Sequence, residues 1–335
     1  MTRLYTSFTQ LRVRTRMADG DLAVMKGRLP KTEDVDAVLV GPTEVRMPDG
    51  RLLAKYLPRA LDEVVLDDIH DILYEVSKGS TDNRGDASGY PRVKTKDNST
   101  RTRTPHVQSS IIGSFDRQMP RMRCRLTAWS GKELDKWHAL FPLFEDINAY
   151  FKRYVPDRYA AQEGFAERTH PDWRIGNTVF TTVTVNRSYP TGVHTDAGDL
   201  DEGFSTLAVL RKGSYTGGLF VFPEYRLGVN MRHGDLLLMD AHQWHGNTFM
   251  TCDVCGQPMG SPTLYPDHTA CGSERISVVA YYRTKMAECG SREDELHQGQ
   301  QFFEKRIREG ADKVLQERTL SEMEAEAYDS PTVTA

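Results

Sequence analysis

The sequence of 335 residues predicts an α+β, mostly β protein whose core is a barrel or jelly roll with flanking helices. Two observations lead to this prediction. From Thr178 onwards, short runs of β-branched and apolar residues follow one another, separated by glycine-rich turns such as 217–218 and 233–234. Before them, apolar residues recur at helical spacing. The length fits one large domain with additions as well as two domains, and we expect the former.

Residues 1–77 are expected to add accessory strands and a helix to this core. A strand-like run covers 36–40, a Pro-Asp-Gly turn follows at 48–50, and apolar residues take helical spacing over 61–76. None of these residues suggests a chemical role.

Residues 78–125 form an unusually basic region, with 11 Lys and Arg against 4 Asp. Its first part, 78–110, is rich in Ser, Thr, Asn and Gly and poor in apolar residues, so we expect a long loop. A solvated loop is the plain interpretation. Because the whole chain carries a net charge of only −4, the alternative is a local phosphate-binding surface on an acidic protein.

The predicted core spans 126–287, and a charged helix and tail are expected over 288–335. A capping-box sequence at 130–133 should begin a helix with a buried apolar face. That face consists of Leu134, Trp137, Leu140, Phe144, Ile147 and Phe151. From Thr178 the apolar period changes to two, which indicates strands. We expect strands over 178–186, 205–210, 219–223, 235–239 and 275–283.

The composition excludes several classes of protein. Hydrophobic residues make up 39% and charged residues 27%, so the chain can bury a sizeable core and is not a disordered protein. No apolar run approaches the roughly 18 residues that cross a bilayer, and the charged segment 1–17 lacks the apolar stretch of a signal peptide. We therefore expect a cytoplasmic protein with no membrane partner, and nothing indicates a protein partner. Five cysteines, an odd number, make a disulfide framework unexpected.

A metal site is predicted around His194 and Asp196. Two residues apart on a strand, their side chains point to the same face, so one metal ion can take both. Two histidines and a carboxylate leave three positions of an octahedron open, which suits iron(II). We expect His245, after the apolar strand 236–239, as the third ligand, with His242 as its competitor.

Arg275 and Ser277 lie two residues apart in a later predicted strand and therefore face the same way. The arginine offers the planar fork that binds a carboxylate through two hydrogen bonds, and the serine can add a hydroxyl. We expect this pair to bind the far carboxylate of 2-oxoglutarate. The alternative is a β-sandwich with surface histidines and an arginine at the edge of its core.

With these residues the sequence resembles a known family, the TET and base-J-binding-protein branch of the 2-oxoglutarate dioxygenases, which includes TET-like enzymes of bacteriophages. The resemblance covers about 110–285 and is strongest in HTDAGD at 194–199 and RISVVAYYR at 275–283. It implies a double-stranded β-helix (jelly-roll, cupin-like) fold and the cofactors iron(II), 2-oxoglutarate and O2. It also places the protein in a host bacterial cytoplasm if a phage encodes it. Asn186 and Tyr189 resemble residues that contact 2-oxoglutarate in neighbouring families.

The resemblance also implies contacts with a base. Tyr281 would stack on the target base, Asp199 stands where TET enzymes have a base-reading asparagine, and Arg283 stands where they have a histidine. The implied reaction is hydrogen abstraction by a ferryl oxidant from the methyl group of a 5-methylpyrimidine in DNA. The base would be flipped out of the duplex, and the basic region would contact phosphates.

A second metal site is predicted between His245 and Arg275, which are separated by more residues than a hairpin needs. The insert 250–273 carries Cys252, Cys255, His268 and Cys271, a C-x2-C-x12-H-x2-C pattern that matches structural zinc. The alternatives are unpaired thiols or a redox pair. Cys124 and Cys289 are expected to be ordinary thiols, although Cys289 can replace His268. We also consider that the insert guides DNA.

The sequence is therefore compatible with four functions. The first is a 5-methylcytosine dioxygenase that forms 5-hydroxymethylcytosine, with further oxidation steps left open. The second is a thymine hydroxylase that forms 5-hydroxymethyluracil, and the third is a protein or small-molecule hydroxylase with the same metal site. The fourth, an inactive zinc-containing DNA-binding protein, is disfavoured by the intact His, Asp and Arg residues.

Overall fold

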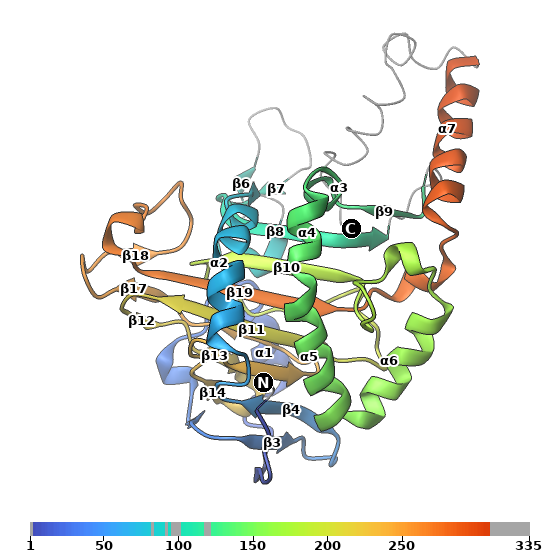
Figure 1. Cartoon of the computed structure of the whole chain (residues 1–335). Helices are drawn as coiled ribbons and strands as arrows, with labels where there is room; N and C mark the ends of the chain where they lie inside the picture. Colours follow the sequence, from blue (N-terminus) through green and yellow to red (C-terminus); the bar gives the residue numbers. More distant parts are fainter. Residues whose placement is uncertain (1–2, 82–83, 91–92, 95–101, 117–121, 309–335) are drawn as a thin grey trace.

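The computed structural model describes residues 3–81, 84–90, 93–94, 102–116 and 122–308. A large mixed sheet runs through the molecule, and helices cover one of its faces (Figure 1). In spatial order its strands are β1 (Thr9–Arg12), β3 (Thr43–Arg46), β4 (Leu52–Leu57), β15 (Leu236–Met239), β11 (Ser205–Lys212), β19 (Glu274–Tyr281), β10 (Thr182–Arg187), β8 (Val107–Asp116) and β5 (Ser80–Thr81), with β9 (Cys124–Leu126) paired to β8.

Three smaller sheets complete the β structure. One consists of β16 (Gly246–Asn247), β13 (Phe220–Phe222), β14 (Leu227–Val229) and β2 (Ala37–Leu39). Another consists of β12 (Tyr215–Gly217), β17 (Met250–Cys252) and β18 (Pro258–Met259), and a third pairs β6 (Val93–Lys94) with β7 (Thr102–Arg103). The sheet of β16, β13 and β14 packs against the large sheet, which completes the double-stranded β-helix that the sequence predicts.

The helices are α1 (Asp19–Met25), α2 (Glu63–Ser77), α3 (Ala128–Lys132), α4 (Leu134–Ala139), α5 (Phe141–Tyr154), α6 (Pro156–Arg168) and α7 (Arg292–Arg308). Short 3-10 turns are η1 (Thr32–Asp34), η2 (Gly85–Ser88), η3 (Pro171–Trp173), η4 (Pro223–Tyr225), η5 (Thr269–Cys271) and η6 (Thr284–Glu288). Among the described residues, no helix is long and apolar enough to cross a membrane.

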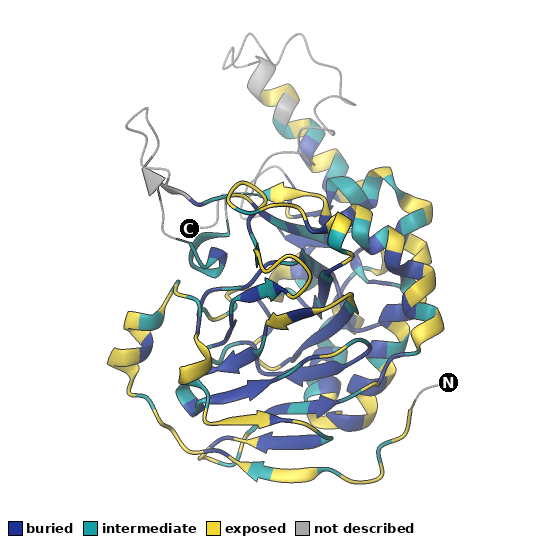
Figure 2. Ribbon diagram, turned by 90° about the vertical axis from the view of Figure 1, so that its left-hand side faces the viewer, coloured by how far each residue is buried: buried dark blue, intermediate teal, exposed yellow. Residues whose placement is uncertain are grey.

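The period-two pattern of the central strands creates two cores. One face of the large sheet, with Val183 and Val278 among its residues, packs against α2 and α5. The opposite face, with Leu207 and Val209, packs against Phe220 and neighbours in the smaller sheet. The strands in the centre of the molecule are therefore largely buried, as the dark blue ribbons of Figure 2 show. Side chains on the second face point into the space between the sheets, where the candidate site lies.

Three sequence-based expectations differ from the structure. The helix expected from 130 onwards is three helices, because Ser130 accepts a hydrogen bond from the Gly113 amide (2.8 Å) and Pro142 starts a new helix without an N–H to donate. Leu134 is 41% exposed rather than buried. The basic region also contains the long strand β8, which lies beside β10 in the large sheet, and β9.

The expectation that Cys124 and Cys289 are ordinary thiols is wrong. The structure joins them in a disulfide, with Cα atoms 5.9 Å apart, between β9 and the residue after η6. The two cysteines are 165 residues apart in sequence, and neither stands in a motif. This pairing leaves Cys252, Cys255 and Cys271 as free cysteines.

Candidate active site

His194, Asp196 and His245 come together between the two sheets. One ligand atom from each lies within 4.8 Å of the others, so the three can hold one metal ion. Asp196 Oδ1 is 3.4 Å from His194 Nε2, and Asp196 Oδ2 is 3.8 Å from His245 Nε2. A pair of backbone hydrogen bonds, each 2.9 Å, joins the two histidines and sets the spacing of their rings.

Both imidazole rings are oriented from behind. His194 Nδ1 is 2.7 Å from the carbonyl oxygen of Gly192, and His245 Nδ1 is 2.9 Å from that of Gln243. A carbonyl only accepts, so each Nδ1 carries the proton and each Nε2 presents a lone pair toward Asp196. The ring of Phe220 stacks on His245 with centroids 5.5 Å apart. The two imidazoles are therefore held in the tautomer that binds a metal.

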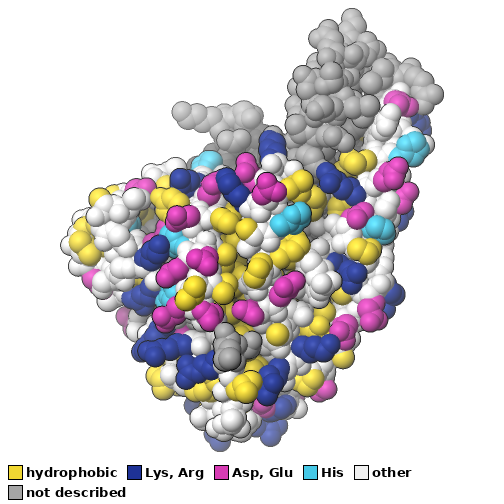
Figure 3. All heavy atoms as spheres, in the orientation of Figure 1, with side chains coloured by type: hydrophobic (Ala, Val, Ile, Leu, Met, Phe, Trp, Pro, Cys, Tyr) yellow, Lys and Arg dark blue, Asp and Glu magenta, His cyan; other side chains and the backbone are white. Residues whose placement is uncertain are grey.

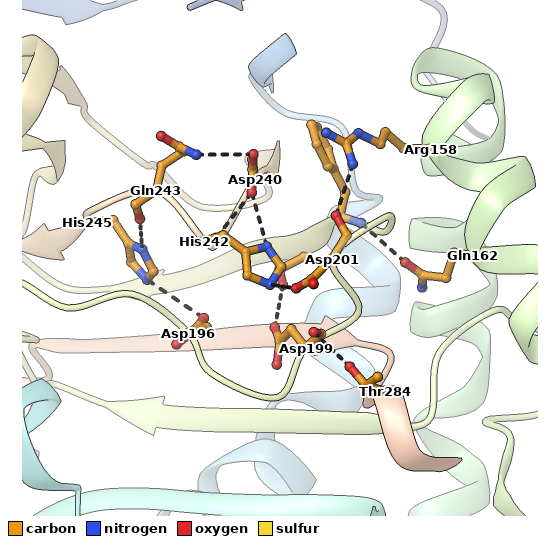
Figure 4. Close-up of polar contacts among 12 residues, drawn as sticks. Arg158, Gln162, Asp196, Asp199, Asp201, Asp240, His242, Gln243, His245 and Thr284 are labelled. Carbon is orange, nitrogen blue, oxygen red and sulfur yellow. Dashed lines mark hydrogen bonds and ion pairs between the residues drawn. The ribbon is translucent and has the colours of Figure 1, made fainter. Parts of the chain in front are cut away.

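His242 points elsewhere. Its ring lies 3.2 Å from Asp240 and 3.1 Å from Asp201, whereas His245 faces Asp196 (Figure 4). The hydrogen bond to Asp240 raises the pKa of His242 to about 9, while burial and the neighbouring His194 lower the pKa of His245 to about 4. His245 is the better third ligand because its Nε2 faces Asp196, whereas the His242 ring is held by Asp240 and Asp201.

Asp196 is ionised in this environment. Burial opposes its charge, but the adjacent imidazoles of His194 and His245 lower its pKa to about 2. Its side chain is 32% exposed and that of His194 is 16% exposed, compared with 5% for His245. The three ligands therefore leave the metal position open on one side, as a substrate-binding metal site needs.

Arg275 and Ser277 face the same interior space. Both are buried, and Ser277 lies opposite Val209 on one side and Asn186 on the other. The guanidinium Nε and Nη2 of Arg275 are buried and have no hydrogen-bond partner among the described residues. Unpaired buried donors are costly, so such a fork indicates a missing anion. Asn186 accepts a hydrogen bond from Ser109.

The hydroxyl of Tyr189 is already engaged, because it donates to the carbonyl oxygen of Ala87. Tyr189 is also buried, so it orders the 84–90 segment beside the site. In this segment Arg84 has a buried Nε with no partner among the described residues, and its positive charge contributes to lowering the pKa of Asp196. The sequence indicated Arg84 only as one of many cations in a basic region.

The three predicted base-contacting residues lie together at the end of β19. Asp199 and Arg283 pair through their backbones, and Arg283 Nε donates to Asp116. Ser205 donates to one oxygen of Asp199 (2.8 Å), and burial, with the charge of Asp196, raises the pKa of Asp199 to about 7. The Tyr281 hydroxyl lies 3.2 Å from that of Thr184.

Gly198 makes this packing possible. Its φ of +94° lies in the region that favours glycine, and an added Cβ would approach Arg283 Nη2 to 2.9 Å. The glycine thus allows the Arg283 guanidinium to pass beside the segment that carries Asp196 and Asp199.

A second cluster consists of Cys252, Cys255, His268 and Cys271, whose ligand atoms also lie within 4.8 Å of one another. It lies in the insert between β16 and β19 and is separate from the first cluster. Among the described residues, these two are the groups of His, Cys, Asp and Glu that can hold a metal ion.

Comparison with known proteins identifies relatives over the β core. The profile of the Tet_JBP family, described as the oxygenase domain of the 2OGFeDO superfamily, matches residues 111–284. Thymine dioxygenase JBP1 of Trypanosoma brucei brucei is 34% identical over 183 residues, which are 54% of this chain and 20% of that protein. The JBP1 of Crithidia fasciculata is 32% identical over 189 residues, 55% of this chain and 21% of that protein.

The chain therefore spans about a fifth of the length of these curated relatives. Among solved structures, NgTET1 in complex with 5mC DNA aligns with a TM-score of 0.49 and 14% identity, over 85% of this chain and 100% of that chain.

Proposed function

The chain belongs to the Tet_JBP family of oxygenase domains in the 2OGFeDO superfamily, the 2-oxoglutarate and iron(II) dioxygenases, and from this premise we propose that it hydroxylates 5-methylcytosine in DNA. The product would be 5-hydroxymethylcytosine. The observation that carries this proposal is the convergence of two Nε2 lone pairs and one ionised carboxylate on a single point.

His194, Asp196 and His245 would hold iron(II). Two imidazoles and one carboxylate on one side of the metal match the donor set of non-haem iron oxygenases, and the exposed side leaves positions for other ligands. Iron(II), 2-oxoglutarate and O2 would supply the oxidation, in which 2-oxoglutarate becomes succinate and CO2 and one oxygen atom enters a methyl C–H bond. Zinc at the second cluster would take no part, because four protein ligands leave no open position.

Arg275 would bind the far carboxylate of 2-oxoglutarate. Its two unpaired donors fit the two oxygens of a carboxylate, and the buried position makes this pairing strong. Ser277 would add a hydroxyl from the same face, and Asn186 lies beside it on β10. The contribution of these residues is orientation: they fix the cosubstrate relative to the metal ligands and exclude water.

The proposed choice of cytosine rests on Asp199 and Arg283, whose hydrogen-bonding groups would suit this base. Cytosine presents two adjacent acceptors, O2 and N3, followed by the N4 donor. Because Asp116 occupies only Arg283 Nε, the two terminal nitrogens can donate to O2 and N3, while the free oxygen of Asp199 accepts from N4. Thymine has a donor at N3 between its two acceptors and cannot use the same fork. Tyr281 would stack on the base.

A base inside a duplex cannot reach this pocket, so the target nucleotide would have to be flipped out. The cations of the basic region 78–125 would then hold the backbone through phosphate contacts. Several of these cations lie outside the described residues: Arg92, Lys96, Arg101, Arg117 and Arg121.

A second candidate function is thymine hydroxylation to 5-hydroxymethyluracil. The observation that favours it is the identity of 30–34% to proteins named thymine dioxygenase over 183–189 residues. Both candidates use the same metal and 2-oxoglutarate site and differ only in the base.

The deciding experiment incubates the protein with iron(II), 2-oxoglutarate and ascorbate on two DNA duplexes that differ only in 5-methylcytosine. Nucleosides are then measured by mass spectrometry. We expect loss of 5-methylcytosine and formation of 5-hydroxymethylcytosine. Conversion of thymine with 5-methylcytosine unchanged would replace the first candidate by the second, and no DNA oxidation despite 2-oxoglutarate turnover would exclude both.

Replacing Arg283 with alanine should lower the selectivity between bases more than the rate of 2-oxoglutarate turnover. The variant loses the fork that reads O2 and N3, and each good bidentate contact discriminates by about 1–3 kcal/mol. We expect the ratio of 5-methylcytosine to thymine oxidation to fall by about 5- to 150-fold while succinate release without DNA stays near the wild-type rate.

Asp116→Asn is the matched variant for this prediction, because it weakens the anchor of Arg283 and leaves the guanidinium in place. It should cause a smaller loss of selection. An unchanged product ratio in Arg283→Ala would show that Arg283 does not read the base.

A further inference from the structure

The insert 250–273 has almost no core of its own. Its buried apolar residues are Met250, Cys252 and Met259, which form a small cluster with Tyr215. The insert carries Asp253 and Asp267 but no Lys or Arg, and the lobe around β17 and β18 presents mostly uncharged side chains (Figure 3). A short polar segment of this kind needs a cross-link to stay folded, and it offers no cation to a phosphate.

We propose that Cys252, Cys255, His268 and Cys271 bind one structural Zn(II), and that this centre holds Tyr215 and Arg275 in place for 2-oxoglutarate. The second half rests on the proposed function. The proposal concerns a structural role of the insert, and the expectation that the insert guides DNA stays a prediction. The same four side chains were indicated by their spacing, and their arrangement in space now supports a closed tetrahedral site.

The turn that carries the first two ligands is built from the backbone. The Gly256 amide donates to the Cys252 carbonyl (2.9 Å), and the Cys252 amide donates to that of Gln257 (3.0 Å). Gly256 takes a φ of +68°, which brings the chain back into β18. One tight turn therefore carries Cys252 and Cys255. The other two ligands, His268 and Cys271, lie at the two ends of η5.

His268 is held in the tautomer that a metal needs. Its Nε2 lies 2.8 Å from the carbonyl oxygen of Pro258, which can only accept, so the proton is on Nε2. Nδ1 then presents its lone pair to Cys255 Sγ at 3.5 Å. With Zn–S of about 2.3 Å and Zn–N of about 2.0–2.1 Å, a tetrahedral site places S and N about 3.6 Å apart. A redox pair of two cysteines would need no such histidine.

Cys289, the competing ligand, is excluded. It forms the disulfide with Cys124 beyond the C-terminal end of β19, whereas Cys271 lies before the start of this strand. Its sulfur is not among the clustered ligand atoms. His268 is therefore the fourth ligand, together with the three free cysteines.

The proposed zinc site is connected to β12 and β19, the strands that carry Tyr215 and Arg275. Cys252 is the β-sheet partner of Tyr215, and β19 begins at Glu274, shortly after Cys271. Ser273 links both sides, because its hydroxyl lies 2.9 Å from the Ser214 carbonyl and 3.4 Å from Cys252 Sγ. A metal here fixes β12 and the start of β19 relative to each other.

Tyr215 and Arg275 share an unusual property. The Tyr215 hydroxyl, like Nε and Nη2 of Arg275, is buried and has no hydrogen-bond partner among the described residues. The two residues are neighbours through Arg211, which pairs with Arg275 across the sheet and stacks on the Tyr215 ring at 3.9 Å. A carboxylate would satisfy all three donors, so Tyr215 joins Arg275 as a further residue for binding 2-oxoglutarate.

Metal content tests the zinc site directly. The measurement uses the Asp196→Ala background, so that zinc in the iron site is not counted. We expect one zinc per chain, none after adding Cys252→Ser and Cys255→Ser, and retention with His268→Cys or Cys289→Ser. Cobalt(II) substitution should give the intense visible bands of a tetrahedral thiolate site. A wild-type chain that lacks zinc at full thermal stability, or a Cys252→Ser, Cys255→Ser chain that keeps it, would overturn the proposal.

The link to 2-oxoglutarate is tested in chains with intact iron ligands. Tyr215→Phe should raise the KM for 2-oxoglutarate about tenfold, because it removes one hydroxyl donor to a charged group. The Cys252→Ser and Cys255→Ser chain should raise it about 10- to 100-fold while iron affinity stays the same. If the wild-type chain binds zinc but the KM is unchanged in both Tyr215→Phe and the zinc-free serine chain, the link is refuted. A protein that binds zinc but oxidises no DNA would instead refute the proposed function, because 2-oxoglutarate binding is still measurable by thermal shift.

Discussion

Replacing Asp196 with alanine is expected to abolish turnover. Among the described residues, this carboxylate is the anionic ligand that faces both Nε2 atoms, and without it two neutral imidazoles must hold a divalent cation alone. Mutation of residues that only contact metal ligands typically lowers activity by about 10- to 100-fold, and the loss in Asp196→Ala should be larger. Anaerobic iron titration should show weakened binding, and mass spectrometry should detect neither succinate nor oxidised nucleoside.

His242→Ala is the matched control for this prediction. His242 is close in sequence to His245, but it pairs with Asp240 and Asp201 instead of Asp196. Iron affinity should therefore survive in His242→Ala and be lost in His245→Ala. If the two histidines behaved in the opposite way, or if Asp196→Ala kept its turnover, the proposed ligand set would be wrong.

Much of the fold was predictable because the core strands follow simple periods. Val183 and Val185 alternate with Thr184 and Asn186, and the structure places the two sets on opposite faces of β10. The predicted strands at 205–210, 219–223 and 235–239 correspond to β11, β13 and β15. The prediction of a double-stranded β-helix is confirmed. The ligand roles remain predictions, although their side chains do converge.

What the sequence did not indicate depends on contacts between distant segments. Cys124 and Cys289 have no motif, and only the packing of β9 beside η6 joins them. Arg84 lies in a polar region whose sequence does not predict buried side chains, yet its Nε is buried near the metal ligands. Tyr215 looks like an ordinary strand residue. Its unpaired hydroxyl becomes visible only when the three strands around it are assembled.

Replacing Arg275 with methionine is expected to separate function from stability. The side chain keeps its apolar stem, and no protein group loses a partner, because Nε and Nη2 have none among the described residues. Removal of a buried charge without a partner should leave the melting temperature unchanged or raised. Truncation of one side of a buried charge pair costs about 2–5 kcal/mol, so the KM for 2-oxoglutarate should rise about 30-fold or more.

Arg187→Met is the comparison that makes this interpretation specific. Arg187 is also buried, but on the opposite face of the sheet, where it lies 3.5 Å from Glu274 and 4.5 Å from the Tyr74 ring. Its loss leaves the Glu274 carboxylate with His70 (2.8 Å) but without its arginine, so the melting temperature should fall while the KM stays near the wild-type value. Scanning fluorimetry and 2-oxoglutarate titrations of both variants would show opposite patterns. A fall in stability without a change in KM for Arg275→Met would mean that this guanidinium supports the fold, and that the cosubstrate carboxylate binds elsewhere.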